Sequence, residues 1–319
     1  MAIWLCMICA CQSASPPTLA ERCRRALDAR LPDAAELCLP VYELTADPAA
    51  GARAARAMQS RDGALPLIEW IANAIGDQAA GADAWLAAGA SRLAVDDARG
   101  ALAAYERAVA VRAAGDTLGQ LRDAAGLLYY YMAQSDFHAA VGQAAIAYDL
   151  LPLVAHPADR ISAYINIASL LTRIGNLSTT ADVLDEARRI VPVTDRYYAN
   201  IRQLDAMVER GRDHPALERL ALLEAHALAI RDGNRVLESY TRFDLIDLAI
   251  RDGDLDGAAA WLRLPFPPDE AVAEAYYRGL LAVARREPRE AVQLVERVLP
   301  KTTADPWIRS LEDVHGRAL

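Results

Sequence analysis

The chain has 319 residues, of which 54% are hydrophobic and only 6% aromatic, and alanine recurs along almost its whole length. This composition is rich in helix formers and poor in strand formers, so it predicts an all-α protein. A formal net charge of −9 without any basic stripe excludes the clustered Lys and Arg that nucleic-acid binding requires. No apolar run reaches the roughly 20 residues that span a bilayer.

Residues 1–18 are predicted to be an export leader and linker. A short apolar stretch is followed by Ser and Pro, an order that is typical of exported proteins. The tetrapeptide Ile8-Cys9-Ala10-Cys11 resembles the lipobox of bacterial lipoproteins, which implies that Cys11 is the lipidated first residue of the mature chain. No Lys or Arg precedes the apolar stretch, so a cytoplasmic protein with an apolar tail is the alternative.

Residues 19–79 are predicted to form degenerate helical hairpins at the N-terminal end of an array. Cys23 and Cys38 lie on either side of Pro32, where we expect the turn between two antiparallel helices. In an exported protein a disulfide could join them, whereas in a reducing compartment they would be buried free thiols. The sequence leaves both states open.

Turn-forming residues recur between residues 80 and 302, and an amphipathic stretch follows each of them. The expected turns are Asp96, Ser135, Gly175, Gly211, Gly253 and Glu287, at steps of 34 to 42 residues. A period of that length with two helices per period is typical of an α-solenoid, whose units bury their apolar faces by stacking. We therefore expect one helical-repeat array.

The clearest repeat is the segment DAWLAAGASRLAVDDARGALAAYERA. Gly89 and Ala101 are small where two helices are expected to cross, and Trp85 and Tyr105 fill the remaining space. This pattern resembles the tetratricopeptide repeat, and weaker copies follow it. The resemblance implies a right-handed α-solenoid of antiparallel helix pairs. Residues 303–319 are predicted to be a C-terminal helix, either a cap or the start of a truncated unit.

The sequence carries no pattern for a catalytic, metal or cofactor site. No two of the five histidines have the i, i+4 spacing of a helix-borne metal pair, and phosphate-binding glycine loops are missing. Asp244 and Asp247 are the nearest approach to the paired carboxylates of a polysaccharide-acting enzyme, which is one alternative function. Acids one helical turn apart more often form a solvated or partner-binding stripe, so no enzyme is expected.

In tetratricopeptide arrays the first helices of successive pairs line the concave face and contact the partner. The resemblance therefore implies a partner-binding set on those helices: Tyr129, Met132, Asn166, Arg173, Tyr198, Arg202, Tyr240, Asp244, Asp247 and Tyr276. Exposed tyrosines suit an extended peptide. At least one tyrosine in each adjacent run is expected in the core. The clamp that some members use for a peptide carboxylate is not expected. It requires two lysines and a second asparagine, and the corresponding positions here hold Ala125, Tyr129 and Tyr198.

The sequence thus predicts a non-enzymatic scaffold that binds a protein or peptide segment. We expect it on the periplasmic side of a bacterial cell envelope, with a lipid anchor as its membrane contact. The main alternative is a cytoplasmic regulatory module that controls a fused or neighbouring effector, such as a protease, kinase or transcription factor.

Overall fold

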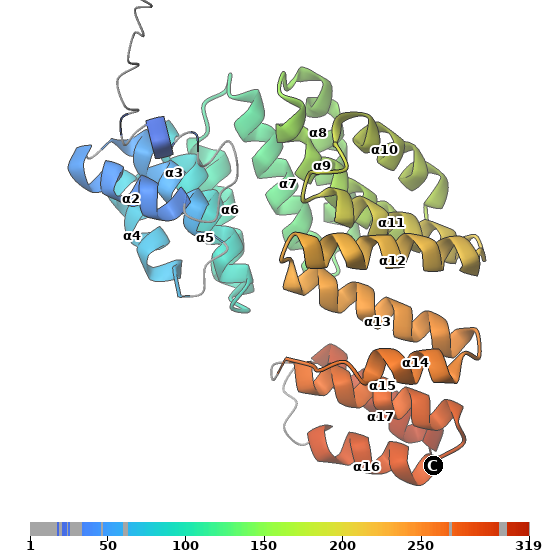
Figure 1. Ribbon diagram of the computed structural model, residues 1–319. Coiled ribbons are helices and arrows are strands. Elements are labelled where there is room, and N and C mark those ends of the chain that lie inside the picture. The colour runs from blue at the N-terminus through green and yellow to red at the C-terminus, as the bar shows by residue number, and fades with distance from the viewer. Residues whose placement is uncertain are drawn as a thin grey trace, which may run out of the picture. The chain divides into compact units, whose positions relative to one another are not determined.

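All regular elements that the structure describes are helices, which confirms the predicted all-α class (Figure 1). The computed structural model describes residues 18, 21–23, 25, 34–45, 47–59, 63–267, 270–299 and 305–318. The chain divides into two compact units between Leu153 and Val154.

The first unit contains an N-terminal hairpin and two regular helix pairs. The hairpin is α2 (Ala34–Thr45) with α3 (Pro48–Met58), and α4 (Leu65–Ile75) and the 3₁₀ turn η1 (Ala79–Gly81) follow it. The pairs are α5 (Ala82–Leu93) with α6 (Ala98–Val111) and α7 (Thr117–Ala133) with α8 (Phe137–Leu150), and η2 (Leu151–Leu153) ends the unit.

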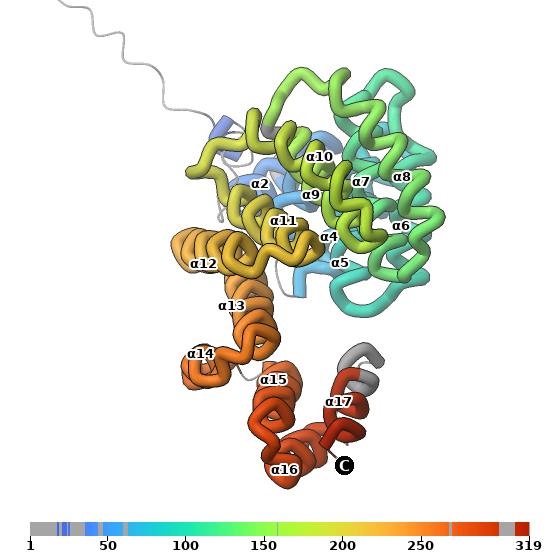
Figure 2. Tube along the Cα trace, turned by 90° about the vertical axis from the view of Figure 1, so that its right-hand side faces the viewer, coloured from blue at the N-terminus to red at the C-terminus, as the bar shows by residue number. Residues whose placement is uncertain are grey.

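The second unit contains four regular pairs and a last helix. The pairs are α9 (Pro157–Arg173) with α10 (Leu177–Ile190), α11 (Tyr198–Gly211) with α12 (Pro215–Arg231), α13 (Arg235–Arg251) with α14 (Leu255–Leu262), and α15 (Ala271–Ala284) with α16 (Pro288–Val298). The last helix, α17 (Asp305–Ala318), packs against α15 and α16. We call the earlier member of each pair its first helix and the later member its second helix. Figure 2 shows α12 and α14 on one side of the stack, with α11, α13 and α15 on the other.

One type of turn joins the two helices of each regular pair. Its residue with positive φ is Asp96, Ser135, Gly175, Asp213, Gly253 or Arg286 in the successive pairs. The following residue, such as Asp97, donates its N–H to the carbonyl five residues earlier, here Arg92 at 3.0 Å. The side chain of Asp97 then accepts the N–H of Gly100 at 2.9 Å and caps the second helix. The end of one helix and the start of the next therefore share a residue.

Four of the six expected turn residues, at positions 96, 135, 175 and 253, are confirmed by their positive φ angles. The prediction for Gly211 is wrong, because Gly211 is the last residue of α11 and the turn residue is Asp213. A Cβ on Gly211 would lie 2.3 Å from Leu177 Cδ1, so this glycine allows two helices to approach closely. The prediction for Glu287 is displaced by one residue, since Glu287 is the N-cap that follows Arg286.

Arg286→Gly is expected to stabilise the second unit by about 1 kcal/mol, because the left-handed conformation costs a non-glycine residue about that much. Arg286 has φ 63° and is exposed, so its side chain contributes little packing to offset this strain. The matched control is Gly253→Ala at φ 76°, which should destabilise by a similar amount. Urea unfolding followed by circular dichroism measures both changes, and an Arg286→Gly variant no more stable than the parent would contradict the prediction.

The close helix crossing predicted at Gly89 is present in the first unit. The Tyr105 ring is buried, and a Cβ on Gly89 would lie 2.8 Å from Tyr105 Cδ1. A Cβ on Gly126 of α7 would lie 3.0 Å from Tyr105 Cε1 and 2.8 Å from Leu86 Cδ1. Two glycines from different helices therefore make the space that the ring fills.

A buried ion-pair network centred on Arg112 links the helices of the first unit. Arg112, whose side chain is only 6% exposed, donates to both carboxylate oxygens of Asp123 at 2.9 and 2.7 Å. It also lies 2.9 Å from Asp83, which Arg56 and Arg122 contact as well. Burial alone would raise the pKa of Asp83, but these three guanidinium groups together lower it. Burial dominates at Asp123 and raises its pKa, although Arg112 opposes the change.

Candidate functional site

A line of polar and aromatic side chains runs along α13. Tyr240, Asp244, Asp247 and Arg251 are four, three and four residues apart, so they lie on one face of the helix. Tyr240 is 58% exposed, and Asp247, which accepts a hydrogen bond from Arg251 Nε at 3.0 Å, is partly exposed. We call these four residues the α13 line. It places three of the predicted partner-binding residues together.

Arg251 of the α13 line and Arg210 of α11 share a buried glutamate. Glu218 of α12 is only 1% exposed, and its Oε1 atom lies 2.7 Å from Arg210 Nε and 2.6 Å from Arg251 Nη2. Arg210, on α11, also donates to Asp244 Oδ1 at 2.9 Å, and Gln203 donates to the other oxygen of Asp244 at 3.4 Å. The network ties α11, α12 and α13 together and fixes the position of the Asp244 carboxylate.

The cluster around the α13 line has an excess of negative charge. Burial raises the pKa of Asp244, the guanidinium of Arg210 offsets part of that rise, and the nearby Asp247 adds to it. With all groups ionised, three carboxylates (Glu218, Asp244 and Asp247) face two guanidinium groups (Arg210 and Arg251), which leaves a net charge of −1. A cationic group is the ligand that such a surface attracts.

Helix α15 supplies the aromatic neighbours of this cluster. Tyr277 stacks on Phe243 of α13 with ring centroids 4.9 Å apart, which is the core role expected for one tyrosine of this pair. Tyr276 makes an edge contact with Tyr277 at 4.9 Å. Burial raises the pKa of the Tyr276 hydroxyl, and the negative charge of Asp247 raises it further. Tyr276 therefore lies within electrostatic reach of the α13 line.

Sequence reasoning did not identify Arg210 and Glu218. A signal for Glu218 was present, because it occupies the same face of α12 as the buried residues Ala221, Leu222 and Ala225. A charge on such a face requires a partner. The partners come from two other helices, and sequence spacing within α12 does not identify them.

The remaining predicted residues of the second unit lie on first helices. Asn166 and Tyr198 are partly exposed, and Arg173 is exposed at the end of α9. Arg202 is held by Glu224 at 2.8 Å and Asp205 at 2.6 Å. A partner would have to compete with these two carboxylates for the guanidinium group. The binding roles of these four residues remain predictions.

Tyr129 and Met132 belong to α7 in the first unit, and only one of them is accessible. Tyr129 is exposed, whereas Met132 is 5% exposed, so the predicted contact of Met132 with a partner is wrong. Their spacing of three residues implies a shared helix face. The turn at Ser135, however, brings α8 back beside the last turn of α7, where Met132 lies.

A disulfide joins Cys23 to Cys38, with their Cα atoms 4.8 Å apart. Both residues are fully buried and pack in the core of the N-terminal hairpins. Of the two states that the sequence left open, the structure contains the bonded one. Cys11, the predicted lipidation site, lies outside the described residues.

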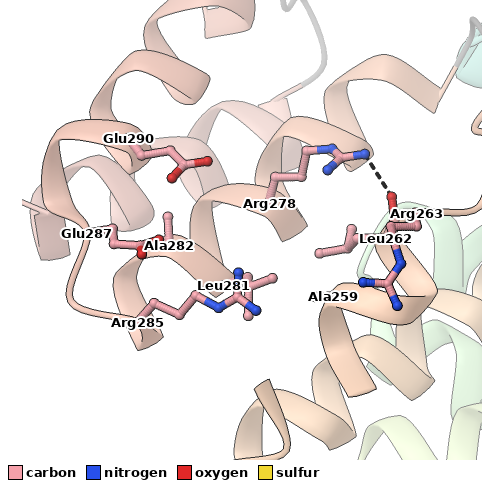
Figure 3. A pocket seen from close by; sticks show the side chains of 9 residues that line it. All are labelled: Ala259, Leu262, Arg263, Arg278, Leu281, Ala282, Arg285, Glu287 and Glu290. Atoms are coloured by element: carbon pink, nitrogen blue, oxygen red, sulfur yellow. Dashed lines mark hydrogen bonds between the residues drawn. The ribbon is translucent and has the colours of Figure 1, made fainter. Parts of the chain in front are cut away.

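A small pocket of about 150 Å³ lies among α14, α15 and α16 (Figure 3). Apolar residues and three arginines line it, together with Glu287 and Glu290, and Arg278 is committed to the Leu262 carbonyl at 2.7 Å. Small-molecule sites usually enclose roughly 300–1,000 Å³, so this pocket is too small for one. In the described part of the chain no three potential metal ligands gather, and no helix there has the length and hydropathy to cross a bilayer.

Comparison with solved structures supports the helical-repeat fold through a match with a TM-score of 0.71. A chain in the crystal structure of the APC/C hetero-tetramer Cut9-Hcn1 matches with a TM-score of 0.71 and 14% sequence identity, over 94% of this chain and 55% of that one. A chain in the structure of Naa15/Naa10 bound to HypK-THB matches with a TM-score of 0.31 and 11% identity, over 94% of this chain and 54% of that one. This chain therefore spans about half the length of the solved chains it matches. No protein-family model matches the sequence, and no curated protein matches it.

At 14% identity the likeness to the Cut9-Hcn1 chain concerns the fold alone. It agrees with the antiparallel helix pairs and the repeated turn described above, and with the small and large residues predicted at the crossing of α5 and α6. The chain is a tetratricopeptide-like α-solenoid.

Proposed function

We propose that this chain is a non-enzymatic scaffold that binds an extended segment of another protein on its first helices, with the α13 line as the centre of the site. The observation that carries the proposal is Tyr240, a 58% exposed aromatic residue in line with Asp247 on one helix face. An exposed tyrosine offers a flat apolar ring and a hydroxyl group, and such residues are enriched among binding hot spots.

The bound segment is expected to carry Lys or Arg. The cluster around the α13 line has a net charge of −1, and the partly exposed Asp247 has Arg251 as its ion-pair neighbour. The whole chain is also acidic, with a formal charge of −9, which favours encounter with basic partners. A basic side chain that approached Asp247 would therefore gain both local and long-range attraction.

The arrangement of Asp244 and Asp247 favours binding over catalysis. Glycoside hydrolysis uses two carboxyl groups on opposite sides of the scissile bond. Here both acids project from one helix, and Asp244 is engaged by Arg210 at 2.9 Å and by Gln203 at 3.4 Å. Both contacts stabilise a fixed carboxylate within an ion-pair network.

Phage display of random peptides against the full chain tests this proposal. The enriched peptides should contain Lys or Arg next to apolar residues, and Tyr240→Ser and Asp247→Asn should each weaken a selected peptide by about 10-fold. Tyr148→Ser is the matched control, because Tyr148 is also exposed but lies on α8 of the first unit. Isothermal titration calorimetry measures the affinities.

Two outcomes would contradict the proposed site. Enrichment of acidic peptides would show that the charge of the α13 line does not select the ligand. Peptides that bind Tyr240→Ser and Tyr148→Ser equally well would place the site elsewhere on the array.

We further propose that the chain functions on the periplasmic side of a bacterial envelope. The Cys23–Cys38 disulfide supports this location, because structural disulfides are rare in reducing compartments. The intact mass of the protein expressed in a bacterial host tests it. Acylation at Cys11, with Cys23 and Cys38 resistant to alkylation until reduced, is the expected result. An uncut soluble product with reactive thiols would support the cytoplasmic alternative.

A further inference from the structure

The second helix α12 has an apolar outer surface. Its exposed residues before the C-terminal Arg231 are all apolar: Pro215, Ala216, Leu217, Leu220, Leu223, Ala227 and Ile230. Leu220 is the most exposed of the leucines among them, at 59%. We call Leu217, Leu220, Leu223, Ala227 and Ile230 the α12 stripe. Their spacing of three or four residues forms a continuous line that is about 20 Å long at 1.5 Å per residue.

The charged residues of α12 are already paired within the chain. Glu218 is buried between Arg210 and Arg251. Arg219 lies 3.0 Å from Asp252, and Glu224 accepts from Arg202 at 2.8 Å. Glu224 lies seven residues after Leu217, on the same face of the helix, and its side chain is 42% exposed. The stripe is therefore an apolar line flanked by charged side chains that are paired within the chain, including Arg231 with Asp232 at 2.7 Å.

The other second helices of the same unit are different. Helix α10 exposes Asp182, Asp185 and Arg189, and α16 exposes Arg289, Glu290, Glu296 and Arg297. Two second helices of this unit thus have charged outer faces, whereas α8 of the first unit exposes Phe137, Val141, Ile146 and Tyr148. An apolar line on a second helix is typical of an interaction surface.

We propose that the α12 stripe is a homodimer interface in which a second copy of the chain packs antiparallel to the first. The exposed charges beyond the two ends of the stripe are complementary, with Asp213 before α12 and Arg235 after it. Among the described residues neither side chain has an ion-pair partner. The length of α12 separates them within one copy, and the proposed dimer pairs Asp213 of one copy with Arg235 of the other.

The symmetry of these positions favours a second copy over an unrelated partner. Asp213 and Arg235 are both eleven residues from position 224, and Leu217 and Ile230 are centred between positions 223 and 224. A two-fold axis near Leu223 therefore superposes stripe on stripe and places Asp213 of each copy near Arg235 of the other. The antiparallel arrangement also sets the dipoles of the two α12 helices in their favourable orientation.

The dimer goes beyond the proposed function and is independent of it. Helices α12 and α13 lie on opposite sides of the stack (Figure 2), so pairing through α12 leaves the α13 line of each copy accessible. Two identical sites in one assembly would raise the avidity for a partner that carries repeated binding segments.

Sedimentation of the full chain, with its free thiols alkylated, tests the interface over about 1–100 µM, the range expected for a single-helix seam. A concentration-dependent dimer is expected. Leu220→Glu combined with Leu223→Glu should raise its dissociation constant at least about 30-fold, because both residues lie at the centre. Val95→Glu is the matched control, since Val95 is 61% exposed on the first unit, and it should leave the dimer unchanged. Circular dichroism confirms folding of each variant.

Charge reversal tests the orientation. Asp213→Lys and Arg235→Glu should each weaken the dimer, and the chain that carries both should regain most of the affinity. A chain that remains monomeric throughout the range would overturn the proposal and assign the stripe to a different protein. A dimer that survives the two glutamates, or a double reversal no better than either single one, would overturn the antiparallel interface.

Discussion

Replacing Arg112 by methionine is expected to lower the free energy of unfolding by about 3–5 kcal/mol. Methionine preserves much of the buried volume but leaves Asp123 without the two hydrogen bonds that now compensate its burial. It also removes one of the three guanidinium groups around Asp83. An uncompensated buried carboxylate is costly in a medium of low dielectric constant. Urea unfolding of the first unit, followed by circular dichroism and tryptophan fluorescence, measures the loss.

Arg107→Met, on α6 five residues before Arg112, is the matched control. Arg107 pairs with Asp77, but both side chains are exposed, so the change should be below about 1 kcal/mol. Adding Asp123→Leu to Arg112→Met should recover a large part of the loss, since it removes the unpaired charge. Equal effects of the Arg112 and Arg107 substitutions would show that the network contributes no more than a surface ion pair.

Gly89→Leu should destabilise the first unit by about 3 kcal/mol through overpacking. Even the first atom of the new side chain would lie 2.8 Å from the Tyr105 ring. Tyr105 cannot move aside freely, because its ring is buried and a Cβ on Gly126 of α7 would also lie only 3.0 Å from its Cε1 atom. The unfolding midpoint in urea measures the effect.

A pair of identical substitutions separates this crowding from helix propensity. Gly89→Ala should destabilise, whereas Gly142→Ala on α8 should stabilise by about 0.5–1 kcal/mol, since a Cβ there meets no atom within 4 Å. If both alanine substitutions stabilise the protein, the crossing of α5 and α6 is looser than the structure indicates.

The helix pairs could be predicted because their determinants are local. Small residues at Gly89 and Ala101, a large one at Tyr105, and turn residues such as Ser135 recur at a spacing that sequence alone displays. Gly233 also forms a turn of this type, between α12 and α13. Gly233 was not predicted because it lies between two expected intra-pair turns, at Gly211 and Gly253. A connection between two pairs was not expected to form the same type of turn.

The candidate site could be predicted only in part because its geometry depends on contacts between helices. The line of Tyr240, Asp244 and Asp247 follows from helical periodicity. The arginine that holds Asp244 lies 34 positions earlier in the sequence, and nothing in its neighbours identifies the pairing. Met132 shows the reverse case, since periodicity placed it on an exposed face that the adjoining helix covers.

Four of the intra-pair turns restrict how such a chain can vary in length. At Asp97, Asp136, Asn176 and Asp254 one residue both closes a helix with its N–H and caps the next with its side chain, so an added or deleted amino acid there would break two sets of hydrogen bonds together. The connections from Arg112 to Asp116 and from Val191 to Tyr197 are longer and contain no such residue. Insertions, tags and grafted helix pairs should therefore be tolerated at those connections, so that the array can be lengthened or shortened by whole cassettes.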